Sequence, residues 1–208
     1  NISLNGYDII KEKYKIQGLI RYVPSKSILF DEFTIYENLY YNASTSLGKL
    51  SSSDIRKQVN IYLKKLDLWE IRYIKVKKLQ GIFQGKRLLL SIGMELIREA
   101  SVLIIDEPEE KLAPYYAEKI IKILKHLALE GKLIITSLQF PSSMSLKTLD
   151  KILILDEGGY IIYHGNPREA LQYFKTNHLP IKSSRSECPT CGNIEGDKIL
   201  YFVESNRI

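Results

Sequence analysis

The sequence has only two cysteines in 208 residues, and no apolar stretch in it approaches the length of a membrane-spanning helix. Cys188 and Cys191 form one Cys-x-x-Cys pair, whereas a structural zinc site normally takes four ligands. His178 is a conceivable third ligand for a metal site, but reduced thiols in a loop are the favoured interpretation. The longest uninterrupted apolar runs, such as Val102 to Ile105, are strand-sized and far below the ~18 residues of a spanning helix. These absences predict a reducing compartment and no bilayer crossing within this piece.

The sequence also lacks an initiating methionine and a signal-peptide pattern. It begins at Asn1, and its first residues resemble a strand and a turn, so we expect a piece of a longer chain. With 45% hydrophobic and 26% charged residues, the composition is typical of a globular chain and excludes disorder, collagen and coiled coils. The net charge of +6 is carried by lysines scattered among acidic residues, which indicates solvated helix faces more than a surface for nucleic acid.

Strand-like and helix-like segments alternate along the chain. The continuous apolar run Ser101 to Ile105 predicts a strand buried on both faces, as in a parallel sheet. A capping box at Thr34 to Glu37 predicts a helix start, and Gly158-Gly159 predicts a hairpin. This alternation predicts an α/β fold with βαβ units around a mostly parallel sheet. The other expected elements are strands over 2–5, 18–23, 133–136, 152–155 and 160–163 and helices over 53–66, 89–97, 117–128 and from 166.

The segment most informative about chemistry is the end of the apolar run, where Asp106 and Glu107 follow Ile105. Ligands of open α/β sheets gather at the carboxyl ends of the strands, so a buried strand would deliver two adjacent carboxylates there. In a phosphoryl-transfer site the first carboxylate would hold Mg²⁺ and the second would polarise an attacking water. A surface turn with two acidic residues is the alternative interpretation, and the surrounding motifs decide between them.

Five segments stand in register around this pair. They are Tyr22 to Lys26, Phe33 to Leu39, Gly81 to Ile97, Gly131 to Ser143 and Leu153 to Gly165. Together they resemble the ATP-binding cassette (ABC) domain of the G (White/pleiotropic) transporter subfamily, in order and at matching intervals over about residues 2 to 175. The resemblance implies an ABC-ATPase core of the P-loop type with a mostly parallel sheet and a helical signature subdomain.

The resemblance also implies a domain organisation and a set of ligands. A nucleotide-binding domain would span 1–178, with a helical subdomain at about 34–97, and 179–208 would link it to a membrane domain placed C-terminally on the same polypeptide. The cofactors would be ATP and Mg²⁺, with Asp106 as the metal ligand and Glu107 and Gln139 as catalytic residues. A second cassette would complete a dimer at the cytoplasmic side of a membrane. No nucleic-acid partner is expected.

The departures from the family pattern are as informative as the match. The phosphate-cradling G-x-x-x-x-G-K-[ST] loop is absent, and in this family it would lie ahead of Asn1. At five further positions that contact nucleotide or the opposite subunit in the family, this sequence has a different residue from the family pattern. Only one glycine of the signature turn is kept. The altered positions are Ser25, Phe83, Gln84, Ala113 and Gln139, and the retained glycine is Gly85. Glutamine at the switch position can donate a hydrogen bond but cannot titrate.

The sequence therefore leaves competing functions open. The first is an ABC transporter nucleotide-binding domain in which ATP hydrolysis drives transport, an ATPase impaired or dependent on its partner. The alternative is a pseudo-ATPase cassette kept as a binding or scaffolding module, which the substitutions favour and the Asp106-Glu107 pair opposes. A third possibility is a soluble cassette protein that acts on nucleic acid or ribosomes, and only the basic net charge supports it.

Overall fold

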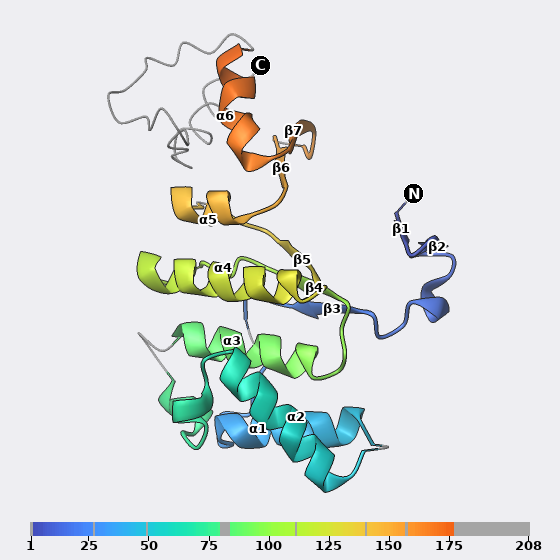
Figure 1. Cartoon of the computed structure of the whole chain (residues 1–208), viewed down its shortest axis with the longest axis vertical. Helices are drawn as coiled ribbons and strands as arrows, with labels where there is room; N and C mark the ends of the chain where they lie inside the picture. The colour runs from blue at the N-terminus through green and yellow to red at the C-terminus, as the bar shows by residue number, and fades with distance from the viewer. Residues whose placement is uncertain are drawn as a thin grey trace. The chain divides into compact units, whose positions relative to one another are not determined.

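The structure, a computed structural model, describes residues 2–26, 28–48, 50–79, 84–110, 112–139, 141–156 and 158–176. The chain divides into two compact units, Asn1–Ser137 and Leu138–Ile208, and each is described by itself. Figure 1 traces the elements along the chain. Within the described residues, no helix combines the length and the apolar character that crossing a bilayer takes.

A small antiparallel hairpin begins the first unit. Strand β1 (Ser3–Leu4) pairs with β2 (Tyr7–Asp8), with Leu4 opposite Tyr7. The two residues of the turn, Asn5 and Gly6, have φ values of 51° and 83°. Asparagine and glycine tolerate this left-handed conformation, which two-residue hairpin turns require. The strand expected over 2–5 is thus confirmed, whereas its partner β2 was not predicted.

A parallel sheet forms the centre of the first unit. Its order is β3 (Ile20–Val23), β4 (Val102–Ile105) and β5 (Leu133–Thr136), so β4 lies in the middle. The register aligns the strand ends, with Val23 opposite Ile105 and Ile105 opposite Thr136. In β4 only Ile104 is not fully buried, as expected for a central strand of a parallel sheet. The predicted parallel sheet is confirmed.

The first two long helices of this unit begin within two residues of their predicted starts, whereas the third and fourth begin at Gln84 and Pro114, ahead of the expected 89 and 117. Their first turns carry no apolar period, so the sequence pattern did not reveal them. The long helices are α1 (Ile35–Ser46), α2 (Ser52–Lys65), α3 (Gln84–Leu96) and α4 (Pro114–Leu129), with short 3-10 turns at Lys13–Lys15, Trp69–Ile71 and Val76–Lys78. Thr34 and Glu37 form the predicted capping box, since the Glu37 N–H donates to the Thr34 hydroxyl and the Thr34 N–H to the Glu37 carboxylate. Ser51 caps α2 by accepting from the Asp54 N–H.

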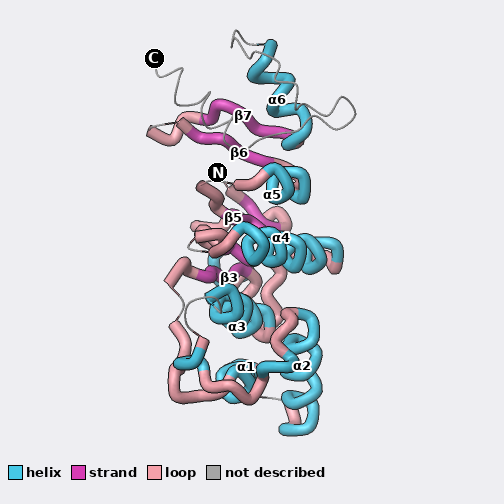
Figure 2. The backbone as a smooth tube through the Cα atoms, turned by 90° about the vertical axis from the view of Figure 1, so that its left-hand side faces the viewer, coloured by secondary structure: helices cyan, strands magenta, loops and turns pink. Residues whose placement is uncertain are grey.

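Helices α1, α2 and α3 pack together into a helical layer, and α3 also contacts strand β3 (Figure 2). Helix α4 packs beside β5 and contacts α3. The layer is apolar because its helices turn residues at helical spacing toward one another. Its fully buried side chains include Ile35, Leu39, Leu63, Leu66, Leu90, Ile92 and Leu96. The sheet is less well covered, because Leu133 and Ile135 of β5 are each about half exposed.

The second unit contains the hairpin that the sequence predicted. Strand β6 (Ile152–Leu155) pairs antiparallel with β7 (Ile161–Gly165), and α6 (Pro167–Thr176) follows. Gly158 and Gly159 both have positive φ, which the turn between the strands requires. Helix α5 (Ser143–Thr148), capped by the Ser142 hydroxyl, occupies a stretch for which the sequence predicted no helix or strand.

The division into a domain over 1–178, a helical subdomain at about 34–97 and a linker over 179–208 stays a prediction. The proposed linker lies outside the described residues, together with Cys188, Cys191 and His178.

Candidate functional site

The carboxyl ends of the strands in the parallel sheet bring together residues that are far apart in the sequence. Val23, Ile105 and Thr136 end their strands side by side. The backbone pairing then continues past the strands, because the Asp106 N–H donates to the Val23 carbonyl at 3.0 Å and the Ser137 N–H to the Ile105 carbonyl at 3.3 Å. We call this end of the sheet, with Tyr22, Asp106, Glu107 and Ser137, the carboxylate edge.

The carboxylate of Asp106 is held by one hydroxyl from each flanking strand. The Ser137 hydroxyl donates to Asp106 Oδ1 at 2.8 Å, and the Tyr22 hydroxyl donates to Oδ2 at 3.3 Å. Desolvation, followed by the nearby Asp106 charge and the hydrogen bond to it, raises the pKa of the Tyr22 phenol above its ordinary value. The phenol therefore stays protonated at neutral pH, as a donor to Asp106 must be.

Glu107 follows in a conformation that side chains other than glycine seldom adopt. Its φ is 44°, and such a left-handed residue costs roughly 1–3 kcal/mol and persists only where its surroundings enforce it. Here the Glu107 N–H donates to the Ser137 hydroxyl at 2.9 Å, and the Glu107 carbonyl accepts from the Glu110 N–H at 3.0 Å. The same serine hydroxyl therefore contacts both acidic residues of the pair.

Mg²⁺ fits this donor set when phosphates complete its coordination. The ion prefers oxygen ligands and is usually held by one or two carboxylates together with substrate phosphates and waters. The hydroxyl donors leave each oxygen of Asp106 with lone-pair capacity for such a ligand. In the part of the chain that the structure describes, no cluster of three or more His, Cys, Asp or Glu side chains could hold an ion by itself.

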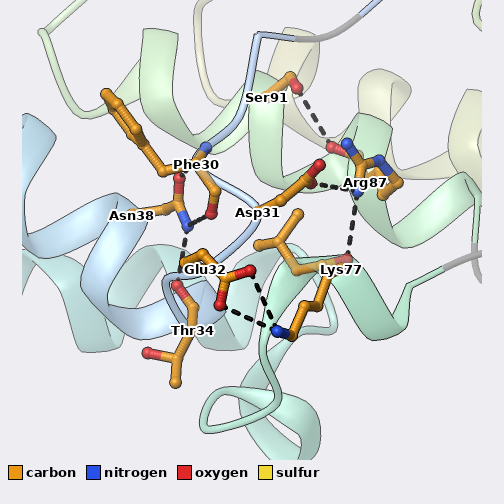
Figure 3. Close-up of polar contacts among 9 residues, drawn as sticks. Phe30, Asp31, Glu32, Thr34, Asn38, Lys77, Arg87 and Ser91 are labelled. Atoms are coloured by element: carbon orange, nitrogen blue, oxygen red, sulfur yellow. Dashed lines mark hydrogen bonds and ion pairs between the residues drawn. The ribbon is translucent and has the colours of Figure 1, made fainter.

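The start of α3 carries the signature residues Gln84 and Gly85, and two basic side chains anchor it. Lys86 donates to the Asp67 carboxylate at 2.8 Å. Arg87 donates to the Asp31 carboxylate at 2.8 Å and to the Val76 carbonyl at 3.1 Å (Figure 3). Gly85 is buried, with Ile120 of α4 at 3.5 Å from the position a Cβ would take. Phe83 lies outside the described residues.

The loop that follows β3 is tied to α1 by a buried asparagine. Asn38 accepts from the Phe30 N–H at 3.0 Å and donates to the carbonyls of Phe30 and Thr34 at 3.1 and 3.0 Å (Figure 3). A buried amide needs such partners, and here it fixes the chain that runs from the carboxylate edge into the helical layer. Sequence reasoning recognised Asn38 as part of a motif and did not identify this contact.

The remaining predicted site residues lie on other elements. Ser25 is exposed, two residues beyond the end of β3, and Ala113 precedes α4 as its N-cap without a capping side chain. Gln139 is exposed in the second unit, which is described separately from the carboxylates. Asp106 and Glu107, neighbours in the chain, lie at the end of β4, and the predicted roles of all these positions stay predictions.

Sequence reasoning missed Tyr22 and Ser137 as members of the site. The signal was available, because Ser137 directly follows a predicted strand and Tyr22 lies next to the last residue of another. Carboxyl ends of parallel strands meet at one edge, so both side chains had a reason to be near Asp106.

Comparisons with known proteins point to one family. A family model described as ABC transporter matches residues 1–110. ABC transporter G family member 13 of Arabidopsis thaliana is 29% identical over 217 residues, which cover 100% of this chain and 32% of that protein. The broad substrate specificity ATP-binding cassette transporter ABCG2 of Mus musculus is 31% identical over 156 residues, which cover 74% of this chain and 24% of that protein.

Among solved structures, cbiO1 of Clostridium perfringens, part of the ABC transporter complex cbiONQ, is similar with a TM-score of 0.66 and 24% identity. The match covers 81% of this chain and 66% of that one. This likeness confirms the predicted α/β fold. The chain spans about a quarter to a third of the length of the two curated relatives.

Proposed function

Because the chain belongs to the ABC transporter family, we propose that it is the nucleotide-binding part of a G-type transporter and binds ATP with Mg²⁺ at the carboxylate edge. The observation that carries this proposal is the Asp106-Glu107 pair at the end of the buried central strand β4. Ligands of open α/β sheets bind at such ends, and two adjacent carboxylates serve a metal ion and a water molecule.

Each acidic residue takes its own role in this proposal. Asp106 holds the ion, directly or through water, with its oxygens oriented by the Tyr22 and Ser137 hydroxyls. When bound, Mg²⁺ neutralises phosphate charge and orients the phosphates. Glu107 accepts a hydrogen bond from the attacking water and so directs a lone pair of that water toward the terminal phosphate. Gln139 stays a predicted catalytic residue of the second unit, where its amide could donate a hydrogen bond to a phosphate but could not titrate.

The altered positions weaken hydrolysis at any site that this chain's own signature completes. Phe83 stands where a hydroxyl would donate to the γ-phosphate, and Ala113 stands where a carboxylate would reach across a dimer. The carboxylate edge keeps its acidic pair, so an intact signature from a second cassette can complete a working site there if residues ahead of Asn1 supply the phosphate loop. The partners are accordingly a second cassette and a transmembrane domain, with this chain on the cytoplasmic side of the membrane.

A pseudo-ATPase that acts as a scaffolding module is the second candidate. The observation that favours it is the N-terminus of α4, where Ala113 offers no side-chain acceptor or donor and no capping hydrogen bond forms. The N-cap of a helix usually has a polar side chain. At this position such a side chain would also have made the contact to a dimer partner.

The test is equilibrium binding of a fluorescent ATP analogue with Mg²⁺ to the full-length protein, followed by single-turnover hydrolysis. We expect saturable binding, and slow hydrolysis that Glu107→Gln reduces by a further factor of roughly 10² or more, the usual contribution of a positioned acid or base. Glu110→Gln is the matched control, because it makes the same acid-to-amide change three residues away and keeps the backbone hydrogen bond to Glu107.

The outcomes separate the candidates. Absence of saturable binding in the full-length protein would contradict the proposed nucleotide site and leave the scaffolding module. Robust turnover that Glu107→Gln abolishes and Phe83→Ser leaves unchanged would show that this chain's signature does not limit hydrolysis.

A further inference from the structure

A single hydroxyl joins the two acidic residues of the carboxylate edge. Ser137 Oγ donates its proton to Asp106 Oδ1 at 2.8 Å and accepts the Glu107 N–H at 2.9 Å. A serine hydroxyl has one proton to give and two lone pairs that accept, so both contacts form at once with one lone pair to spare. Ser137 therefore determines the direction of one carboxylate and the backbone position of the next residue together.

The backbone at Glu107 shows why the second contact matters. With φ at 44°, this residue holds a left-handed conformation in a non-glycine side chain. Such a conformation persists only where the surroundings enforce it, and the hydrogen bond from the Glu107 N–H to Ser137 is a restraint of this kind. The direction in which the Glu107 side chain leaves the main chain thus depends on a residue of the neighbouring strand end.

Tyr22 contacts the same carboxylate from the opposite side. Its hydroxyl donates to Asp106 Oδ2 at 3.3 Å, which is longer than the 2.8 Å contact of Ser137 and correspondingly weaker. The two donors come from β3 and from the residue after β5, the strands that flank β4. Asp106 is therefore oriented from both sides by neutral donors, which leave its negative charge in place.

We infer that Ser137 is a positioning residue for the Mg²⁺-nucleotide site, with Tyr22 as a weaker second one. This inference rests on the proposed function, since it concerns the ion that Asp106 would hold. Hydrogen-bond partners of metal-binding carboxylates typically change metal affinity by about 10- to 100-fold when they are removed. Ser137 would therefore contribute to the gain in nucleotide affinity that Mg²⁺ provides, and much less to nucleotide binding without the ion.

The experiment measures the dissociation constant of the fluorescent ATP analogue with Mg²⁺ and with EDTA, in the full-length protein. Ser137→Ala should reduce the affinity gain from Mg²⁺ by roughly tenfold. Ser137→Thr keeps the hydroxyl at an exposed position and should retain the gain. Tyr22→Phe should reduce it by about two- to threefold, in line with its longer contact.

The matched control is Thr136→Val, which removes a hydroxyl one residue away. The Thr136 hydroxyl donates to the Ser137 carbonyl at 3.3 Å, so its loss should leave the Mg²⁺ effect unchanged. A second readout needs no ligand. Amide hydrogen exchange at Glu107 should become about tenfold faster in Ser137→Ala and stay unchanged in Thr136→Val, while unchanged exchange at Leu103 and Ile105 shows that the sheet is intact.

These measurements separate failure of the inference from failure of the proposed function. If the wild-type protein binds the analogue with a Mg²⁺-dependent gain that Ser137→Ala keeps, the inference is wrong and the nucleotide site stands. An unchanged exchange rate at Glu107 in Ser137→Ala would also overturn it. If the wild-type protein shows no saturable binding, the proposed function is wrong and this inference falls with it.

Discussion

The helical layer and the carboxylate edge belong to the same unit, but the layer is held by buried apolar side chains and the edge by polar groups. In the layer, Leu39, Leu66 and Ile92 are completely buried, and α3 places Gly93 where Leu66 and Leu39 leave no space for a side chain. At the edge, Asp106 and Glu107 are held by hydroxyls and backbone groups near the surface. Stability therefore comes from the layer, and the groups suited to chemistry lie where few apolar contacts depend on them.

Two further contrasts define the difference. A carboxylate in the layer, Asp67, binds the ammonium groups of Lys86 and Lys119, whereas Asp106 at the edge binds hydroxyls. Glu99 after α3 and Glu107 after β4 both have positive φ, but the Glu107 N–H donates to a side chain at another strand end, the Ser137 hydroxyl. Asp67 is thus paired with cations, whereas neutral hydroxyls donate to the Asp106 carboxylate.

Glycine packing should give the largest effect that sharpens this comparison. A Cβ at Gly93 would lie 2.8 Å from Leu66 Cδ1 and 3.2 Å from Leu39 Cδ2, whereas at Gly85 in the same helix the nearest atom is 3.5 Å away. Overpacking costs about 1–3 kcal/mol, and alanine at a helix position with room for its methyl group gains up to about 1 kcal/mol over glycine. We expect Gly93→Ala to be less stable than Gly85→Ala by about 2 kcal/mol in urea unfolding.

Equal stability of the two glycine variants would contradict this prediction, because it would mean that Leu39 and Leu66 move aside without cost. The comparison holds residue type and helix constant, so the difference reports packing in the layer.

A smaller change in the free energy of unfolding is expected at a residue of positive φ that follows the last helix of the layer. Glu99 is exposed and has a φ of 61°. Glycine adopts this conformation freely, so Glu99→Gly should raise the free energy of unfolding by about 0.5–1 kcal/mol, after allowance for the greater freedom of glycine in the unfolded chain. Glu118→Gly within α4 is the control and should lose about 1 kcal/mol. Thermal unfolding measures both, and a loss in Glu99→Gly would show that its side chain stabilises the fold.

The smallest expected effect concerns charge in the layer. Hydrogen bonds from Lys119 and then Lys86 lower the pKa of Asp67 below its usual value, against a smaller opposing effect of desolvation. A lowered pKa in the folded state means that the stabilisation is complete above the unfolded pKa of about 3.9 and is lost as the pH falls through the lower folded pKa. Asp67→Asn removes the charge and keeps a residue that tolerates the local φ of 55°.

The stability difference between wild type and Asp67→Asn should thus be constant from about pH 5 to 7, below about 1 kcal/mol for such exposed pairs, and should shrink below about pH 4. Urea unfolding at several pH values measures it. A difference that stays the same down to pH 3 would show that the ion pairs make no contribution.

Much of the fold could be predicted because the relevant patterns are local. The continuous apolar run at 102–105 predicted the central strand, and the capping box at Thr34 and Glu37 formed as expected. Gly158-Gly159 predicted the β6–β7 hairpin. Helix α5 was missed because it is short and its six residues carry little periodicity, so only the cap at Ser142 indicated it.

The candidate site was predictable only in part, for a physical reason. Asp106 and Glu107 are adjacent in sequence and follow a strand, so the pattern itself placed them at a sheet edge. Tyr22 and Ser137 lie 84 and 31 residues from Asp106, and their contacts depend on the strand order β3-β4-β5 and on its register. No local pattern specifies that order.

The sequence by itself determined the elements of this protein, its central buried strand, the acidic pair at the end of that strand and the family to which the motifs belong. The tertiary structure alone decided which hydroxyls orient Asp106 and what holds Glu107 in its left-handed conformation. The reason is that helix and strand patterns arise from neighbours along the chain, whereas the direction of a carboxylate is determined by groups that only the pairing of distant strands brings within hydrogen-bond distance.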